Sequence, residues 1–173
     1  GELEGVEYTE MMYEVYAPGG VALLVNILTD NKNRTASEIR HLLSRGGGNL
    51  GEAGCVAYLF KRKGSIAIDA GKFSEDKVME IALEAGAEDV STSDGIIEVT
   101  TDPESFVGVV EAIEKAGIQN DGAEISMVAD TTISLDKEKT AKVMKLIEML
   151  EEHDDVQSVA SNLDVPDDYE SDE

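Results

Sequence analysis

The stretch from Ser65 to Val128 alternates strand and helix patterns in the order βαββαβ, which restricts this part of the chain to few folds. Four runs have the short apolar pattern of strands: residues 65–70, 87–91, 96–100 and 124–128. Two helical patterns lie between them, one over residues 74–85 and one that begins at Asp102-Pro103 and ends near Gly117. Ser93-Asp94-Gly95 has the composition of a hairpin turn. The order predicts a complete ferredoxin-like domain.

The flanking segments predict a second set of strands and helices. The expected strands are residues 6–16, 20–28, 56–60 and 156–161. One helix is predicted to start at a capping box of Thr35 and Glu38 and to stop at Gly46-Gly47-Gly48, and the other covers residues 137–152. We therefore expect an α+β chain of two ferredoxin-like α/β-sandwich domains, one inserted into the other. The first comprises residues 1–63 and 131–163, the insert comprises residues 64–130, and residues 164–173 form a disordered acidic tail.

Charge is distributed very unevenly along the chain. The net charge is −23, yet all four arginines fall between residues 34 and 62. Residues 30–64 contain seven basic and three acidic side chains, a net charge of +4, and the remainder carries about −27. Such segregation predicts one surface that meets an anionic partner on a body that repels it elsewhere.

Composition excludes several other classes. The most apolar run, Val21–Leu28, suits a buried strand and is far shorter than a membrane span. A single cysteine, Cys55, allows no intrachain disulfide, and no secretory signal is apparent, so we expect a cytoplasmic protein without a membrane partner. His41, His153 and Cys55 show no metal-ligand spacing, and no acid–base pair or nucleophile stands out. We expect no catalytic residue, metal, cofactor or small-molecule substrate.

Three parts of the basic segment, around residues 30–64, could contact phosphate. Each of them can also be interpreted as having only a structural role. Residues 29–35 (TDNKNRT) would form either a helix-start turn or an anion site at a helix N-terminus. The GGGNLG loop, residues 46–51, follows a helix and precedes a strand, which is the reverse of a dinucleotide-binding context. It would be a helix stop with a flexible loop, or a place where backbone N–H groups approach phosphate. Lys61-Arg62-Lys63 would be a solvated strand end or part of the same basic face, with Tyr58 and Phe60 in the core or stacked on bases.

The order of these motifs resembles the YebC/PmpR family, which includes the mitochondrial translational activator of cytochrome c oxidase. The resemblance is carried by NRT before the helix, by GGNLG, and by the aromatic-basic strand end, and it extends over the whole chain. It implies that this chain corresponds to the second and third domains of the family and lacks the basic helical N-terminal domain. It also implies a non-enzymatic, nucleic-acid-directed regulator of gene expression.

The family implies two different roles. One is a ribosome-associated, RNA-binding translation factor that aids synthesis of difficult stretches such as proline-rich ones. The other is a DNA-binding regulator of transcription. A small basic patch on an acidic body favours insertion into a structured RNA pocket, so we expect the first role, with ribosomal RNA or DNA as partner. A protein-interaction adaptor is a third possibility, because an exposed sheet edge can pair with a partner.

The residues expected to contact nucleic acid are the same in either role. Lys32, Arg34, Arg45, Lys61, Arg62 and Lys63 would contact phosphate, and Asn31, Asn33 and Asn49 would donate hydrogen bonds nearby.

Overall fold

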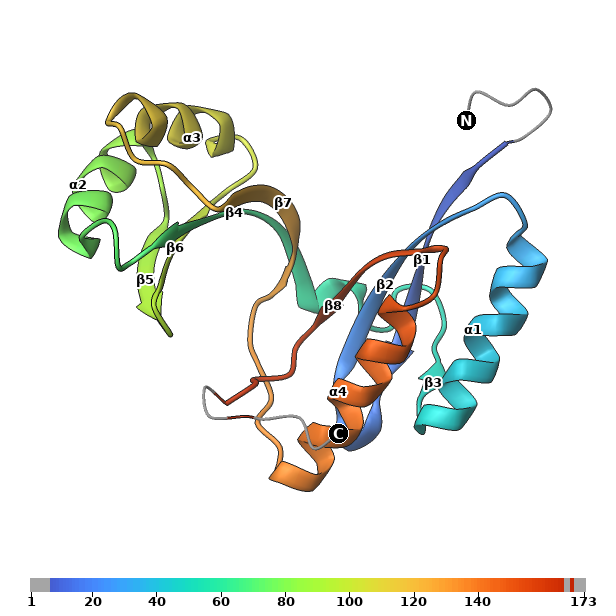
Figure 1. Cartoon of the computed structure of the whole chain (residues 1–173). Coiled ribbons are helices and arrows are strands. Elements are labelled where there is room, and N and C mark those ends of the chain that lie inside the picture. Colours follow the sequence, from blue (N-terminus) through green and yellow to red (C-terminus); the bar gives the residue numbers. More distant parts are fainter. Residues whose placement is uncertain (1–6, 167–168, 170–173) are drawn as a thin grey trace. The chain divides into compact units, whose positions relative to one another are not determined.

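The computed structural model describes residues 7–166 and residue 169, and the chain divides into two compact units (Figure 1). Unit 1 consists of the residues up to Phe60 together with those from Ala129 onward, and unit 2 is Lys61–Val128. Residues 61–63 therefore belong to unit 2, whereas the sequence boundary assigned them to the first domain. No helix in the described residues has the length and hydropathy needed to cross a membrane.

Unit 1 is an antiparallel sheet of four strands with two helices. Its main elements are β1 (Thr9–Tyr16), β2 (Ala22–Thr29), α1 (Lys32–Gly46), β3 (Asn49–Leu50), α4 (Lys137–Glu151) and β8 (Val156–Ser161), with short 3-10 turns η1 (Pro18–Gly20) and η2 (Ala57–Leu59). The strand order is β3-β1-β2-β8, so the most apolar strand, β2, is central, as its pattern predicts.

Unit 1 has the predicted order of strands and helices, but this is not the order of a ferredoxin-like domain. β1 and β2 pair as a hairpin from Thr9 opposite Thr29 to Tyr16 opposite Ala22, with only the short η1 and no α-helix between them. The order is therefore ββαβαβ, and the prediction of a second ferredoxin-like domain is wrong for unit 1. The short connection permits only a turn, in which Gly19 and Gly20 have φ of 77° and 82°. A crossover to a parallel strand would need a dozen or more residues.

The core of unit 1 lies between the sheet and both helices. Leu23, Val25 and Ile27 alternate along β2 and are fully buried. They pack in one cluster with residues of both helices: Ile39 and Leu43 of α1, and Val143, Leu146 and Leu150 of α4. Because residues two apart on a strand share a face, α1 and α4 cover the same face of the sheet.

Unit 2 has the predicted element order βαββαβ. Its elements are β4 (Phe60–Asp69), α2 (Glu75–Ala85), β5 (Asp89–Ser93), β6 (Ile96–Thr101), α3 (Phe106–Lys115) and β7 (Gly122–Ala129). The strand order is β5-β6-β4-β7. Asp94 and Gly95 have φ of 53° and 79°, as the predicted hairpin turn requires.

Cross-strand pairs form the centre of the unit 2 core. Ile66 lies opposite Val99 and Ile68 lies opposite Ile97, and all four are fully buried. α2 and α3 contribute apolar side chains to the same cluster, among them Val78, Ala82, Val109 and Ile113. Both units thus have an α+β architecture, each with a four-stranded sheet and packed helices.

The segment before β4 differs from the sequence prediction. Residues 57–59 form η2 rather than a strand, and β4 begins at Phe60 instead of Ser65. The backbone N–H groups of Val56 and Ala57 donate to the Glu14 carboxylate at 2.9 and 2.7 Å, which holds this segment in a turn. Of the predicted acidic tail, Asp164 accepts a hydrogen bond from Ser134 and lies in ordered structure. Residues 167–168 and 170–173 lie outside the described residues.

Candidate nucleic-acid interface

The start of α1 is capped by Asn31, so the predicted capping box of Thr35 and Glu38 is wrong. The Asn31 side chain accepts a hydrogen bond from the backbone N–H of Arg34 at 3.1 Å. Thr35 lies inside the helix and is fully buried. The predicted nucleic-acid contacts Asn31, Lys32 and Asn33 are exposed at this end of α1.

Arg34 is engaged within the protein. Its Nη2 donates to Asp155 Oδ2 at 3.0 Å, and the same nitrogen lies 3.5 Å from Asp30 Oδ1. Its Nε lies 3.8 Å from Glu38 Oε1. Asp155 follows α4 in the chain, so this ion pair ties the turn before β8 to the start of α1. Part of the charge that the sequence assigned to phosphate is thus already matched by the protein's own carboxylates.

Asp155 takes the place of an external anion near this helix start. Its Oδ2 accepts hydrogen bonds from the hydroxyl of Thr35 at 2.7 Å and of Thr29 at 3.3 Å. Burial alone would raise the pKa of Asp155, but the hydrogen bonds from Thr35 and Arg34 and the charge of Arg34 outweigh it. The pKa lies below its usual value, and Asp155 is a stable carboxylate.

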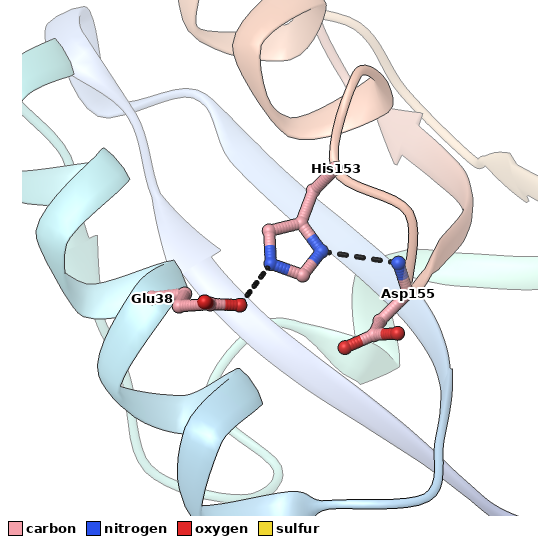
Figure 2. Close-up of side chains that lie close together, drawn as sticks. All are labelled: Glu38, His153 and Asp155. Carbon is pink, nitrogen blue, oxygen red and sulfur yellow. Dashed lines mark hydrogen bonds and ion pairs between the residues drawn. The ribbon is translucent and has the colours of Figure 1, made fainter.

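Figure 2 shows His153 between Glu38 and Asp155. The His153 Nδ1 accepts a hydrogen bond from the Asp155 backbone N–H at 3.1 Å, and the His153 Nε2 lies 2.8 Å from Glu38 Oε1. Accepting at Nδ1 leaves the proton on Nε2, which then donates to Glu38. The three side chains could be brought around a metal ion. Here, however, Nε2 carries the proton and donates a hydrogen bond, and the Arg34 guanidinium already pairs with Glu38 and Asp155. The three side chains therefore form a structural network of hydrogen bonds and ion pairs.

The GGGNLG loop is built by intramolecular contacts. Gly47 caps α1 with φ of 79°, and its N–H donates to the Leu43 carbonyl. The N–H of Gly48 also donates to Leu43, and that of Gly51 donates to the Glu14 carbonyl. A Cβ on Gly46 would lie 2.6 Å from Leu146 Cδ1, so this glycine allows α4 to approach closely. These N–H groups are already used, which favours the helix-stop interpretation over a phosphate cradle.

Arg45 and Asn49 are exposed at the far end of α1 and in β3. Arg45 lies eleven positions after Arg34 along α1, which corresponds to about 16 Å of helix. The structure therefore does not bring the predicted unit 1 contacts into one cluster, since Lys32 and Arg34 lie at one end of α1 and Arg45 at the other.

The remaining predicted contacts lie in unit 2, at the beginning of β4. Lys61 and Arg62 are exposed, and Lys63 is partly buried. The Lys63 Nζ donates to both oxygens of Glu88, at 2.7 and 2.8 Å. Lys63 is thus held in an ion pair, whereas the described residues record none for Arg62.

The two aromatic residues before this run have different environments. Phe60 is buried, which agrees with the core interpretation, and Tyr58 has 72% of its surface exposed. Tyr58 is therefore available for stacking on a base.

Comparison with known proteins assigns the family. The profile described as "TACO1/YebC second and third domain" matches residues 8–163. The chain belongs to the TACO1/YebC family. The resemblance found in the sequence is confirmed, and the match is to the second and third domains of the family.

Several relatives of this TACO1/YebC chain carry the name "probable transcriptional regulatory protein". The relative from Treponema denticola is 54% identical over 170 residues, which cover 98% of this chain and 69% of the relative. The relative from Moorella thermoacetica is 55% identical over 170 residues, covering 96% and 67%. These names describe a family of probable transcriptional regulators and not of enzymes.

The fold of this TACO1/YebC chain matches that of a solved relative. The crystal structure of the conserved hypothetical protein Aq1575 from Aquifex aeolicus superimposes with a TM-score of 0.86 at 47% identity. The match covers 96% of this chain and 69% of the other.

Two basic residues of this TACO1/YebC chain were not among the predicted contacts. Lys142 and Lys145 of α4 line a pocket together with Arg45 at the end of α1. They are about a hundred positions from Arg45 in the sequence, so the local charge count over residues 30–64 could not include them.

Proposed function

We propose that this protein regulates gene expression in the cytoplasm by binding nucleic acid, and that it controls transcription. The observation that carries the proposal is family membership, because close relatives are named as probable transcriptional regulatory proteins. The local net charge of +4 over residues 30–64, in a chain of net charge −23, supports a restricted contact with phosphate.

The proposed contact residues differ in whether their positive charge is already paired with a carboxylate of the protein. Lys32, Arg45 and Arg62 are exposed side chains to which no ion pair is assigned in the described residues. Arg34 and Lys63 are already paired with carboxylates. We infer that the first group supplies most of the attraction and that Arg34 and Lys63 mainly order the surface around it.

A role in translation is the second candidate, and one structural feature favours it. Along the described chain no α-helix directly follows another, so the described residues contain no helix-turn-helix unit for reading a major groove. A small basic surface on an acidic body suits a pocket of folded RNA better than a long duplex.

Crosslinking in cells would separate the two candidates. The protein is crosslinked to nucleic acid in its host, purified under denaturing conditions, and the attached nucleic acid is sequenced. Enrichment of promoter DNA would support transcriptional control. Enrichment of one discrete region of ribosomal RNA, with little DNA, would contradict transcriptional control and support a role in translation. Recovery of neither would overturn the proposal and leave a protein-interaction adaptor.

A further inference from the structure

A pocket of about 490 Å³ in unit 1 lies where the end of α1 meets α4. Its lining residues are Pro18, Arg45, Gly46, Gly47, Lys142, Lys145, Leu146 and Met149. Its volume lies within the range of about 300–1,000 Å³ that is typical of ligand sites.

The charge of this lining is unusual for the chain. Acidic residues outnumber basic ones by 37 to 14, yet the lining contains three basic side chains and no carboxylate. Arg45, Lys142 and Lys145 are all exposed. The recorded ion pair of this group joins Lys142 Nζ to Glu138 at 3.9 Å, between two side chains that are 61% and 84% exposed. Such a pair is weak, so Lys142 can turn to a stronger anion.

The positions of these cations follow from the two helices. Lys142, Lys145 and Met149 are spaced i, i+3 and i+7 along α4, which places them on one side of the helix. Leu146 is fully buried beneath them, and Gly46 lets it pack against the end of α1. The C-terminal end of α1 contributes only about half a negative charge. Three full positive charges outweigh it, so the pocket attracts anions.

We propose that this pocket binds the phosphate backbone of a nucleic-acid strand, with one nucleotide entering it. This inference rests on the proposed function and names a site for it. Arg45 and the two lysines would contact phosphate, and the apolar surface of Pro18 and Met149 would pack against a sugar or base. The planar guanidinium of Arg45 can also donate two parallel hydrogen bonds to one phosphate group.

A matched pair of variants on α4 tests the site. Lys142→Ala with Lys145→Ala removes two charges from the pocket. Lys137→Ala with Lys139→Ala removes two charges from exposed residues of the same helix that do not line it. Binding of fluorescein-labelled 12-nucleotide single-stranded RNA, and separately of a 12-base-pair DNA duplex, is measured by anisotropy at several salt concentrations with the 173-residue chain. Thermal unfolding of each variant checks that it is folded.

We expect the pocket variant to bind about tenfold more weakly at low salt, and the slope of log K against log salt to fall by about two. The control variant should change both quantities much less. The probe whose binding the pocket variant weakens more, single-stranded RNA or duplex DNA, is the form of nucleic acid that the pocket binds.

Three results would overturn the inference, and they differ in what else they imply. Equal losses in the two variants would reject the pocket and leave nucleic-acid binding intact. Full displacement of the oligonucleotide by an equimolar acidic peptide of ten glutamates would show a site for carboxylates instead. No binding of either probe by the unmodified chain at low salt would reject the pocket and the proposed function together.

Discussion

The Glu14 carboxylate accepts a hydrogen bond from the backbone N–H of Ala57 at 2.7 Å, although the two residues are 43 positions apart in the sequence. The same carboxylate accepts from the N–H groups of Gly54 at 2.6 Å and Val56 at 2.9 Å. Glu14 is nearly buried in β1. One side chain therefore anchors the segment that leads from β3 into β4.

We predict that Glu14→Gln destabilises the protein by about 1–3 kcal/mol. Glutamine keeps one acceptor oxygen but places an NH2 donor among N–H groups, and at least one of these groups loses its partner. Urea denaturation measures the change in the free energy of unfolding. Glu10→Gln is the control, because Glu10 lies on the same face of β1 and is exposed. An equal effect of both substitutions would show that the contacts of Glu14 contribute nothing specific.

The Glu14 carboxylate should also make the free energy of unfolding depend on pH. Burial alone would raise the pKa of Glu14, but the three backbone N–H groups outweigh it and the pKa lies below its usual value. The unfolded chain therefore takes up this proton first as the pH falls. The stabilisation by Glu14 is complete above about pH 5 and is lost as the pH falls through about 4.3 towards the lower folded-state value.

Other acidic residues change stability over the same pH range, because protonation relieves repulsion in a chain of net charge −23. The difference in unfolding free energy between the unmodified protein and Glu14→Gln removes this shared effect. We expect that difference to be constant from pH 7 to about pH 5 and to shrink below it. A difference that stays constant down to pH 3 would contradict the lowered pKa.

Gly64 predicts an effect within unit 2. A Cβ at this position of β4 would overlap the Thr101 hydroxyl and the Phe106 ring. We expect Gly64→Ala to destabilise unit 2 by about 1–3 kcal/mol, as overpacking of a close contact does. Gly108 is the matched control, because it is exposed in α3 and a Cβ there would touch nothing within 4 Å. Gly108→Ala should stabilise the helix by up to about 1 kcal/mol.

Amide hydrogen exchange would locate the two glycine effects. Faster exchange in the strands of unit 2, with unit 1 unchanged, is expected for Gly64→Ala. Unchanged exchange in both units would mean that Thr101 and Phe106 move aside at little cost.

Local patterns predicted most elements because they depend on neighbours in the sequence. The strand at residues 156–161 and the helices that start after Ser74 and Asp136 lie where the hydrophobic periodicity places them. The predicted strand at residues 56–60 failed because Glu14, far away in the chain, holds residues 56 and 57 in a turn. The elements of unit 1 follow the predicted order, but their assignment to a ferredoxin-like domain failed because it was inferred from the number of elements and not from the length of their connections.

The candidate site was harder to predict because it depends on contacts between residues that are far apart in the sequence. The charge segregation is visible in the sequence, but the partners of each charge are not. Asp155 lies 121 positions from Arg34 and neutralises part of its charge. Lys142 and Lys145 join Arg45 only once α4 has packed beside the end of α1. Tertiary packing therefore decides which of the basic residues remain available to an external anion.

The ion pair between Arg34 and Asp155 gives a prediction that separates structural from binding roles. Asp155→Ala removes the acceptor of Thr29, Thr35 and Arg34, and we expect it to cost about 2 kcal/mol of unfolding free energy. Arg34→Ala should cost less, because Arg34 is 45% exposed and Thr35 still binds Asp155.

Arg62 supplies the comparison for binding. It is exposed at the start of β4, whereas Arg34 already faces Asp30, Glu38 and Asp155. We expect Arg62→Ala to lower the salt slope of oligonucleotide binding by about one and to leave thermal unfolding unchanged. Arg34→Ala should do the reverse, with a lower unfolding temperature and a nearly unchanged slope. If Arg34→Ala instead lowered the salt slope as much as Arg62→Ala, the Arg34 guanidinium would have to leave Asp155 when the oligonucleotide binds. Asp155→Asn should then tighten the complex, because it removes the competing carboxylate.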